Sequence, residues 1–177
     1  MSAIINTPGS KSGAIGLMGG VTVADQWRLN TSESFAAGDH EIDNYLEQVS
    51  GRGQGTLGSA MTQSGGIFTF PSTGIWQIFM NLDCGAASND FSRYNQAKIF
   101  ATVNDSTYEQ LARGNNALVY AAASSHGVNM SCQSLFHVEA TSSHKVKFKF
   151  QNAQTITLEA NDDYNITTFT FIRLGHS

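Results

Sequence analysis

The sequence has few charged residues. Asp, Glu, Lys and Arg make up 14% of its 177 residues, whereas about a quarter is usual for a soluble domain. The formal net charge is −4, and no basic patch is visible, so the composition argues against a nucleic-acid partner. Lys145, Lys147 and Lys149 form the densest basic group. Because they alternate with apolar residues, they are expected on the solvent face of a strand.

Long apolar runs and cysteines are also scarce. No run approaches the roughly 18 apolar residues that span a bilayer, so we expect no membrane insertion. The first twenty residues lack the basic and apolar segments of an export leader, and we expect none. Cys84 and Cys132 are the two cysteines, too few for a disulfide framework. Two buried thiols are favoured, and a single disulfide between them stays open.

Proline occurs twice, and Pro71 lies between two strongly apolar runs. Proline has no N–H to donate to a sheet, so it occupies strand ends, edges and corners. The following Ser72 and Thr73 are typical turn residues, and Gly74 can adopt a positive φ. The stretch from 66 to 77 therefore predicts a strand, a tight corner and a second strand.

Short strand-like segments fill most of the chain. They lie at residues 25–30, 45–49, 67–70, 75–84, 96–104, 128–140, 145–153, 156–159 and 166–175. Residues 105–114 look like a charged connection with room for one helical turn. Short strands separated by turn signals predict an all-β sandwich. The last segment is apolar on both faces, which predicts a strand buried on both sides.

Residues 1–23 differ from the rest, so we divide the chain into an extended glycine-rich arm, 1–23, and a domain, 24–177. The arm has one charged residue, Lys11, and its apolar residues include Ile4, Ile5, Ile15 and Leu17. Such a segment cannot fold alone. We predict an arm that becomes ordered against a partner through those four residues; the alternative is a solvated tail.

No motif for catalysis or cofactor binding stands out, so we expect no enzyme and no cofactor. The five histidines, at positions 40, 126, 137, 144 and 176, show no metal-ligand spacing. Gly53, Gly55 and Gly58 match a nucleotide-binding pattern, but no strand-helix context accompanies them. Asp162 and Asp163 follow Asn161, and calcium binding there stays open beside the simpler interpretation of a polar turn.

Three motifs, in order between about 60 and 175, resemble C1q-like domains. The first, "GGIFTFPSTGIWQIFMNL", resembles a Gly-x-Phe-x-x-Pro-x-x-Gly stretch followed by an aromatic-rich strand. The matching residues are Gly66, Phe68, Pro71, Gly74 and Trp76. "SLFHVEATSSHKVKFKFQN" resembles the family's paired strands, and "NDDYNITTFTFIRLG" its closing segment.

The C1q and tumour-necrosis-factor superfamily has a ten-stranded jelly roll that assembles as a trimer. The resemblance therefore implies this fold and a homotrimer, with Pro71 at a corner between strands of different sheets. It also implies that the last strand lies mid-sheet near the trimer axis, with Phe169, Phe171 and Ile172 at the trimer interface.

The chain also resembles C1q-like structural proteins of tailed marine bacteriophages, through "ADQWRLN" and "GIFTFPSTGIW". This resemblance implies a non-enzymatic virion protein, released by lysis. The preferred function is a capsid decoration protein whose arm contacts the major capsid protein or another virion protein. A tail or fibre-tip protein that binds a host receptor, such as a surface glycan, is the alternative. A carbohydrate-binding module is less favoured, because Trp27 and Trp76 both lie within strand patterns.

Overall fold

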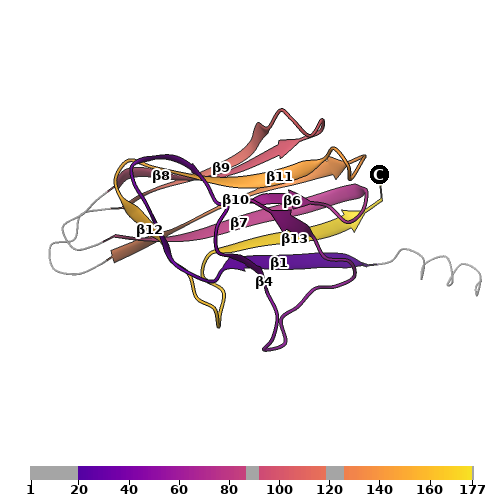
Figure 1. Cartoon of the computed structure of the whole chain (residues 1–177), viewed down its shortest axis with the longest axis horizontal. Coiled ribbons are helices and arrows are strands. Elements are labelled where there is room, and N and C mark those ends of the chain that lie inside the picture. The colour runs from indigo at the N-terminus through magenta and orange to yellow at the C-terminus, as the bar shows by residue number, and fades with distance from the viewer. Residues whose placement is uncertain (1–19, 87–91, 119–125, 177) are drawn as a thin grey trace, which may run out of the picture.

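The computed structural model describes residues 20–86, 92–118 and 126–176. These residues form thirteen strands and no helix, in two antiparallel sheets stacked face to face (Figure 1). In this described part there is accordingly no helix long and apolar enough to cross a membrane. Sheet A consists of β1 (Val23–Leu29), β2 (Glu33–Phe35), β4 (Leu46–Gln48), β7 (Gly74–Ala86), β10 (His126–Val138), β12 (Ile156–Leu158) and β13 (Thr168–Gly175). Sheet B consists of β3 (Gly38–Glu41), β5 (Thr62–Ser64), β6 (Ile67–Thr69), β8 (Ser92–Thr102), β9 (Glu109–Leu118) and β11 (Lys145–Asn152).

The order of the strands confirms an all-β sandwich. Sheet A runs β2-β12-β7-β13-β1-β4, and β10 pairs with the other side of β7 along its whole length. Sheet B runs β5-β6-β11-β8-β9, with β3 also paired to β11. Strand β13 lies between β7 and β1, which confirms the prediction that the last strand is central in its sheet.

Aromatic side chains fill the space between the sheets. Alternate residues of β11 and β13 point inward and are fully buried, as the period of two along a strand requires. Phe68 of β6 contacts three rings of the core, those of Trp27, Phe148 and Phe171, at centroid distances of 5.1 to 5.5 Å. Edge-on and tilted contacts of this kind stabilise a core beyond the area they bury.

Pro71 marks the passage of the chain from one sheet to the other. Strand β6 ends at Thr69 in sheet B, and β7 begins at Gly74 in sheet A. Trp76 holds the corner, since its Nε1 donates a hydrogen bond to the carbonyl oxygen of Ser72 at 3.2 Å. The predicted corner between two sheets is confirmed, and a residue without an N–H fits where no ladder continues.

Gly74 is the residue of this corner that tolerates least change. Its φ is +135°, and an added Cβ would lie 2.4 Å from the carbonyl oxygen of Gly175. Gly74→Val should therefore destabilise the protein by roughly 2–3 kcal/mol, through backbone strain and displacement of β13. Pro71→Ala should cost about 1 kcal/mol or less, mainly through unfolded-state entropy. Urea unfolding of both variants measures this, and equal effects would contradict the corner's geometry.

The structure differs from the sequence prediction at residues 105–114. The prediction of a charged connection there is wrong, because Glu109–Leu118 forms β9. Most β9 residues are exposed on both faces, so no apolar alternation marks the strand. The predicted arm, 1–23, lies outside the described residues except for its last four, and Val23 already belongs to β1. Ile4, Ile5, Ile15 and Leu17 all lie outside the described residues.

Candidate interaction surface

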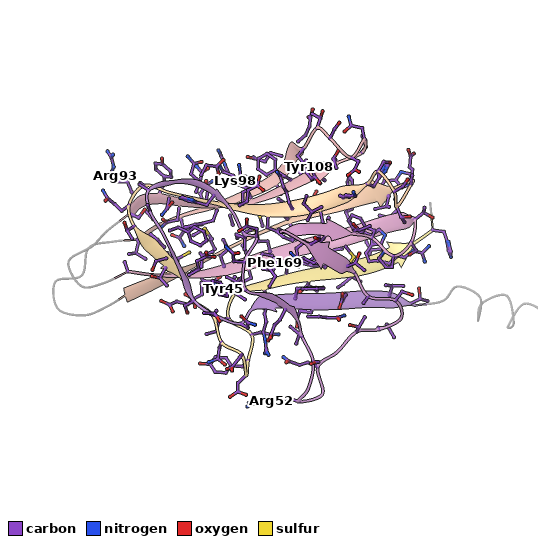
Figure 2. All side chains as sticks on the ribbon, viewed as in Figure 1. Tyr45, Arg52, Arg93, Lys98, Tyr108 and Phe169 are labelled. Atoms are coloured by element: carbon purple, nitrogen blue, oxygen red, sulfur yellow. The ribbon has the colours of Figure 1, made fainter. Side chains whose placement is uncertain are left out.

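The outer face of sheet B is charged, and its charges pair within the chain. Its four ion pairs are Lys149–Asp39 (2.7 Å), Lys98–Asp39 (3.2 Å), Lys147–Glu41 (2.5 Å) and Lys145–Asp105 (2.5 Å). The Lys147 ammonium also lies 4.5 Å from the centre of the Tyr108 ring. Figure 2 labels Lys98 on β8 and Tyr108 in the loop just before β9. The predicted solvent face of β11 is confirmed as a self-paired surface.

Asp39 links this surface to stability in acid. Partial burial raises the pKa of Asp39, but hydrogen bonds and charges from Lys149 and Lys98 outweigh it, so the pKa lies below its ordinary value of 3.8. A lowered folded-state pKa contributes stability that is present above pH 3.8 and is lost as the pH falls through the folded value. Asp39→Asn should therefore flatten the fall in melting temperature below about pH 4. An unchanged acid profile in the variant would contradict this.

The outer face of sheet A, by contrast, carries no charged side chain across its centre. Strand register aligns its outward residues in two rows across β1, β13, β7 and β10: Ala24, Ile172, Gln77 and Leu135 in the first, and Gln26, Thr170, Phe79 and Gln133 in the second. Hydrogen bonds join Gln26 to Thr170 at 2.9 Å and Gln77 to Gln133 at 3.2 Å. The polar side chains of the two rows thus partly satisfy one another's hydrogen-bonding groups.

Two large apolar side chains stand exposed in these rows. Leu135 is 59% exposed and Phe79 is 38% exposed, on the adjacent strands β10 and β7. Leu174, near the end of β13, is also exposed. Depletion of charge combined with exposed aromatic and aliphatic side chains is typical of a protein–protein interface. We call the two rows and Leu174 the sheet A face.

The structure corrects two of the three predicted trimer-interface residues. Phe169 and Phe171 are fully buried inside the single chain, where they pack on Phe148 and Phe68; Figure 2 places Phe169 between the sheets. Their side chains have no surface left for a partner, because alternate residues of β13 point into the sandwich. Ile172 lies on the sheet A face and stays a predicted interface residue.

A notch opens between the edges of the two sheets, with a volume of about 330 Å³. Strands β9 and β10 meet closely at Gly114, where an added Cβ would lie 2.1 Å from the Ser131 carbonyl oxygen. The notch lies toward the first residues of β9. Its lining includes Val103, Leu111 and Phe136, with Asn104, Thr107 and Glu109 among the polar neighbours. We call this cavity the β9–β10 notch.

The two cysteines do not form a disulfide. Cys132 pairs with Met80 and Cys84 with Val128, so the thiols lie four residues apart along neighbouring strands. That spacing is about 13 Å, beyond the 7 Å between Cα atoms that a disulfide allows. The prediction of buried thiols is confirmed for Cys84, and Cys132 is half-buried.

Both thiols should react slowly. Burial raises the pKa of Cys132 to about 11, and burial with the nearby Asp83 and Glu159 raises the pKa of Cys84 further. Because the thiolate is the reactive form, alkylation at pH 8 should be about 100-fold slower than for an exposed cysteine. Intact-mass time courses with iodoacetamide measure this. Failure of both cysteines to react after non-reducing denaturation would reveal a disulfide and contradict the register.

The residues considered for metal binding are dispersed. Asp163 forms an ion pair with Arg52 at 2.8 Å, and Arg28 donates to the backbone carbonyl of Asp162. Among the described residues no three His, Cys, Asp or Glu side chains gather closely enough to hold an ion. Gly53, Gly55 and Gly58 lie in the loop between β4 and β5, and a strand rather than a helix follows them, so the structural context of a nucleotide-binding turn is missing.

Sequence reasoning missed Phe79, Leu135 and Leu111 as surface residues. For Phe79 and Leu135 a signal was present, because each is a large apolar residue at an outward position of an otherwise polar strand face. For Leu111 no signal existed, since it lies at an irregularity in the pairing of β9 with β8.

Comparison with known proteins shows the fold and not the family. No family model and no curated protein sequence matches the chain. Among solved structures, murine APRIL at pH 8.5 matches with a TM-score of 0.58 and 15% identity, over 86% of this chain and 98% of that one. Eiger TNF from S. frugiperda matches with a TM-score of 0.62 and 9% identity, over 89% and 95%. The chain therefore has a tumour-necrosis-factor-like jelly-roll fold.

Proposed function

We propose that this protein is a non-enzymatic structural component of a virion, which assembles as a homotrimer through the sheet A face. The observation that carries the proposal is the contrast between the two outer faces. Sheet B pairs its charges within the chain, whereas the sheet A face exposes Phe79 and Leu135 among uncharged amides. A monomer in water gains nothing from this arrangement, but a second copy would bury it.

Within the virion, the preferred role is decoration of the capsid shell, with the arm, 1–23, bound to the major capsid protein or another virion protein. The support is the resemblance of "ADQWRLN" and "GIFTFPSTGIW" to phage structural proteins, together with the apolar composition of the arm, in which Lys11 is the single charged residue. A tail or fibre-tip location, with a host surface glycan as ligand, uses the same trimer and differs in copy number.

The tryptophans give little support to a carbohydrate-binding module. Trp76 is fully buried, and Trp27 stacks edge-on against Phe68 at a ring-centroid distance of 5.3 Å. Stacking on a sugar needs an exposed aromatic face, which Trp76 lacks and which the half-buried Trp27 offers only in part.

Two measurements test the proposal. Native mass spectrometry of the full chain should give three chains at micromolar concentration, and a stable monomer would overturn the trimer. Quantitative mass spectrometry of purified virions should then find this chain in a fixed ratio to the major capsid protein. A ratio near unity supports shell decoration, a ratio of a few copies per particle supports the tail alternative, and absence from the particles overturns both.

A further inference from the structure

The β9–β10 notch has the features of a docking site for an apolar side chain. Its walls come from the end of β8, the loop that joins β8 to β9, the beginning of β9 and the inward face of β10. Val103 at the rim is 60% exposed, and Leu111 is also exposed, whereas Phe136 forms a buried part of the lining. The cavity of about 330 Å³ is large enough for one or two aliphatic side chains.

A β-bulge accounts for the position of Leu111. Ile99 pairs with Ala112 and Phe100 with Gln110, so Leu111 is the extra residue of β9. Bulges redirect side chains and are frequent beside functional sites.

The notch and the root of the arm lie at the same end of the sandwich. At that end Val23 pairs with Arg173, Val138 with Gly74, and Lys145 with Thr102. Figure 1 shows β1 beginning beside the C-terminal end of β13 there. If neighbouring copies bound a common surface through this end, the start of β1 and the β9–β10 notch of each copy would lie at a similar height above that surface.

Composition identifies the arm as a fitting occupant. Residues 1–19 contain Ile4, Ile5, Ile15 and Leu17, and their single charged residue is Lys11. The lining of the notch combines apolar side chains with the acidic residue Glu109. An extended chain from residue 20 back to residue 4 reaches roughly 50 Å, which exceeds the radius of gyration of about 16 Å for a chain this long. The arm can therefore reach an adjacent molecule.

We propose that residues 1–19 of one trimer bind in the β9–β10 notch of a neighbouring trimer, with an aliphatic arm side chain against Leu111 and Phe136, and Lys11 facing Glu109. The inference rests on the proposed trimer and names a neighbouring trimer as the virion protein that the arm contacts. A single arm binds weakly, but three arms and three notches on each trimer act together. Linked trimers would form a continuous layer over a surface.

Photo-crosslinking of the full chain tests the linkage. A benzophenone amino acid replaces Leu111 in one preparation, and preformed trimers with and without heavy-isotope labelling are mixed. Concentrations up to about 1 mM populate contacts of millimolar affinity. The expected product is a heavy–light crosslink between position 111 and residues 1–19. The matched control carries the same group at Tyr94, which is similarly exposed on β8, and should yield at least tenfold less of this product.

The other outcomes overturn the inference. Crosslinks to residues 1–19 that join only chains of one preformed trimer place the arm within its own trimer. If no crosslink to residues 1–19 forms, or if positions 111 and 94 give equal yields, the notch is not the binding site. The wild-type trimer is checked by native mass spectrometry, so failure of the linkage is distinguishable from failure of the proposed trimer. A Lys11→Glu variant should lower the heavy–light yield several-fold at low salt, and an unchanged yield contradicts the pairing with Glu109.

Discussion

Replacing Phe79 with Asp should convert the proposed trimer into monomers that keep their fold. Phe79 lies at the centre of the sheet A face, between Thr170 of β13 and Gln133 of β10. Its side chain points away from the core of its own chain, so a carboxylate there remains solvated in the monomer. In the trimer the same carboxylate would be buried without a charged partner, because the flanking side chains are uncharged.

The expected effect on assembly is large. Loss of a central aromatic contact typically costs 2 kcal/mol or more at a single interface, and burial of an unpaired charge adds to it. Each trimer contains three such interfaces, so the concentration at which the trimer dissociates should rise at least about 100-fold. Sedimentation velocity over a dilution series measures the midpoint, and circular dichroism verifies the fold.

Tyr94→Asp is the matched control. Tyr94 is an aromatic residue of nearly equal exposure, 40% against 38%, but it lies on β8 of sheet B. The control variant should dissociate at the wild-type concentration. Equal dissociation midpoints for the wild type and Phe79→Asp would show that the sheet A face is not the trimer interface.

The sequence could predict the class of fold because its strongest signals are local. Alternation along β11 identifies Val146, Phe148 and Phe150 as inward residues, and Pro71 with Gly74 identifies the passage between sheets. These signals depend on period, φ and missing donors, which a chain carries within a few residues. They need no knowledge of which strands are neighbours.

Properties that depend on neighbouring strands could not be predicted in the same way. The double apolar face of β13 suggested an interface at Phe169 and Phe171, but only the position of β11 and β6 beneath them shows that both belong to the core. The sheet A face requires the register of four strands, and the β9–β10 notch requires the bulge at Leu111. Local patterns in the amino-acid sequence do not specify those strand pairings.

Asp25 is the clearest example of a residue whose role depends on which segments are its neighbours. Its carboxylate is 2% exposed and accepts five hydrogen bonds. The donors are the backbone N–H groups of Gln26 (3.0 Å) and Met61 (2.9 Å), Trp27 Nε1 (2.9 Å), Gln48 Nε2 (2.9 Å) and Thr56 Oγ1 (2.7 Å). They come from β1, β4 and the glycine-rich loop 49–61, so one carboxylate fastens the loop to the edge of sheet A.

Asp25→Ala should destabilise the protein by about 4 kcal/mol, because it leaves several buried donors without an acceptor. For a chain of this length the melting temperature should fall by roughly 8–16 °C. Asp25→Asn keeps the size but turns an amide NH₂ toward donors, and should lose about half as much. The exposed Asp43 serves as control, and Asp43→Ala should stay within about 0.5 kcal/mol of the wild type.

Trypsin provides a local measurement of the same contact. Arg52 lies in the loop that Asp25 holds, and Figure 2 shows it at the tip of this loop. Its ion-pair partner is Asp163. Release of the loop in Asp25→Ala should speed cleavage after Arg52 under conditions where the rest of the chain stays folded. If cleavage and melting both match those of Asp43→Ala, the five hydrogen bonds contribute nothing net and the anchoring role of Asp25 is wrong.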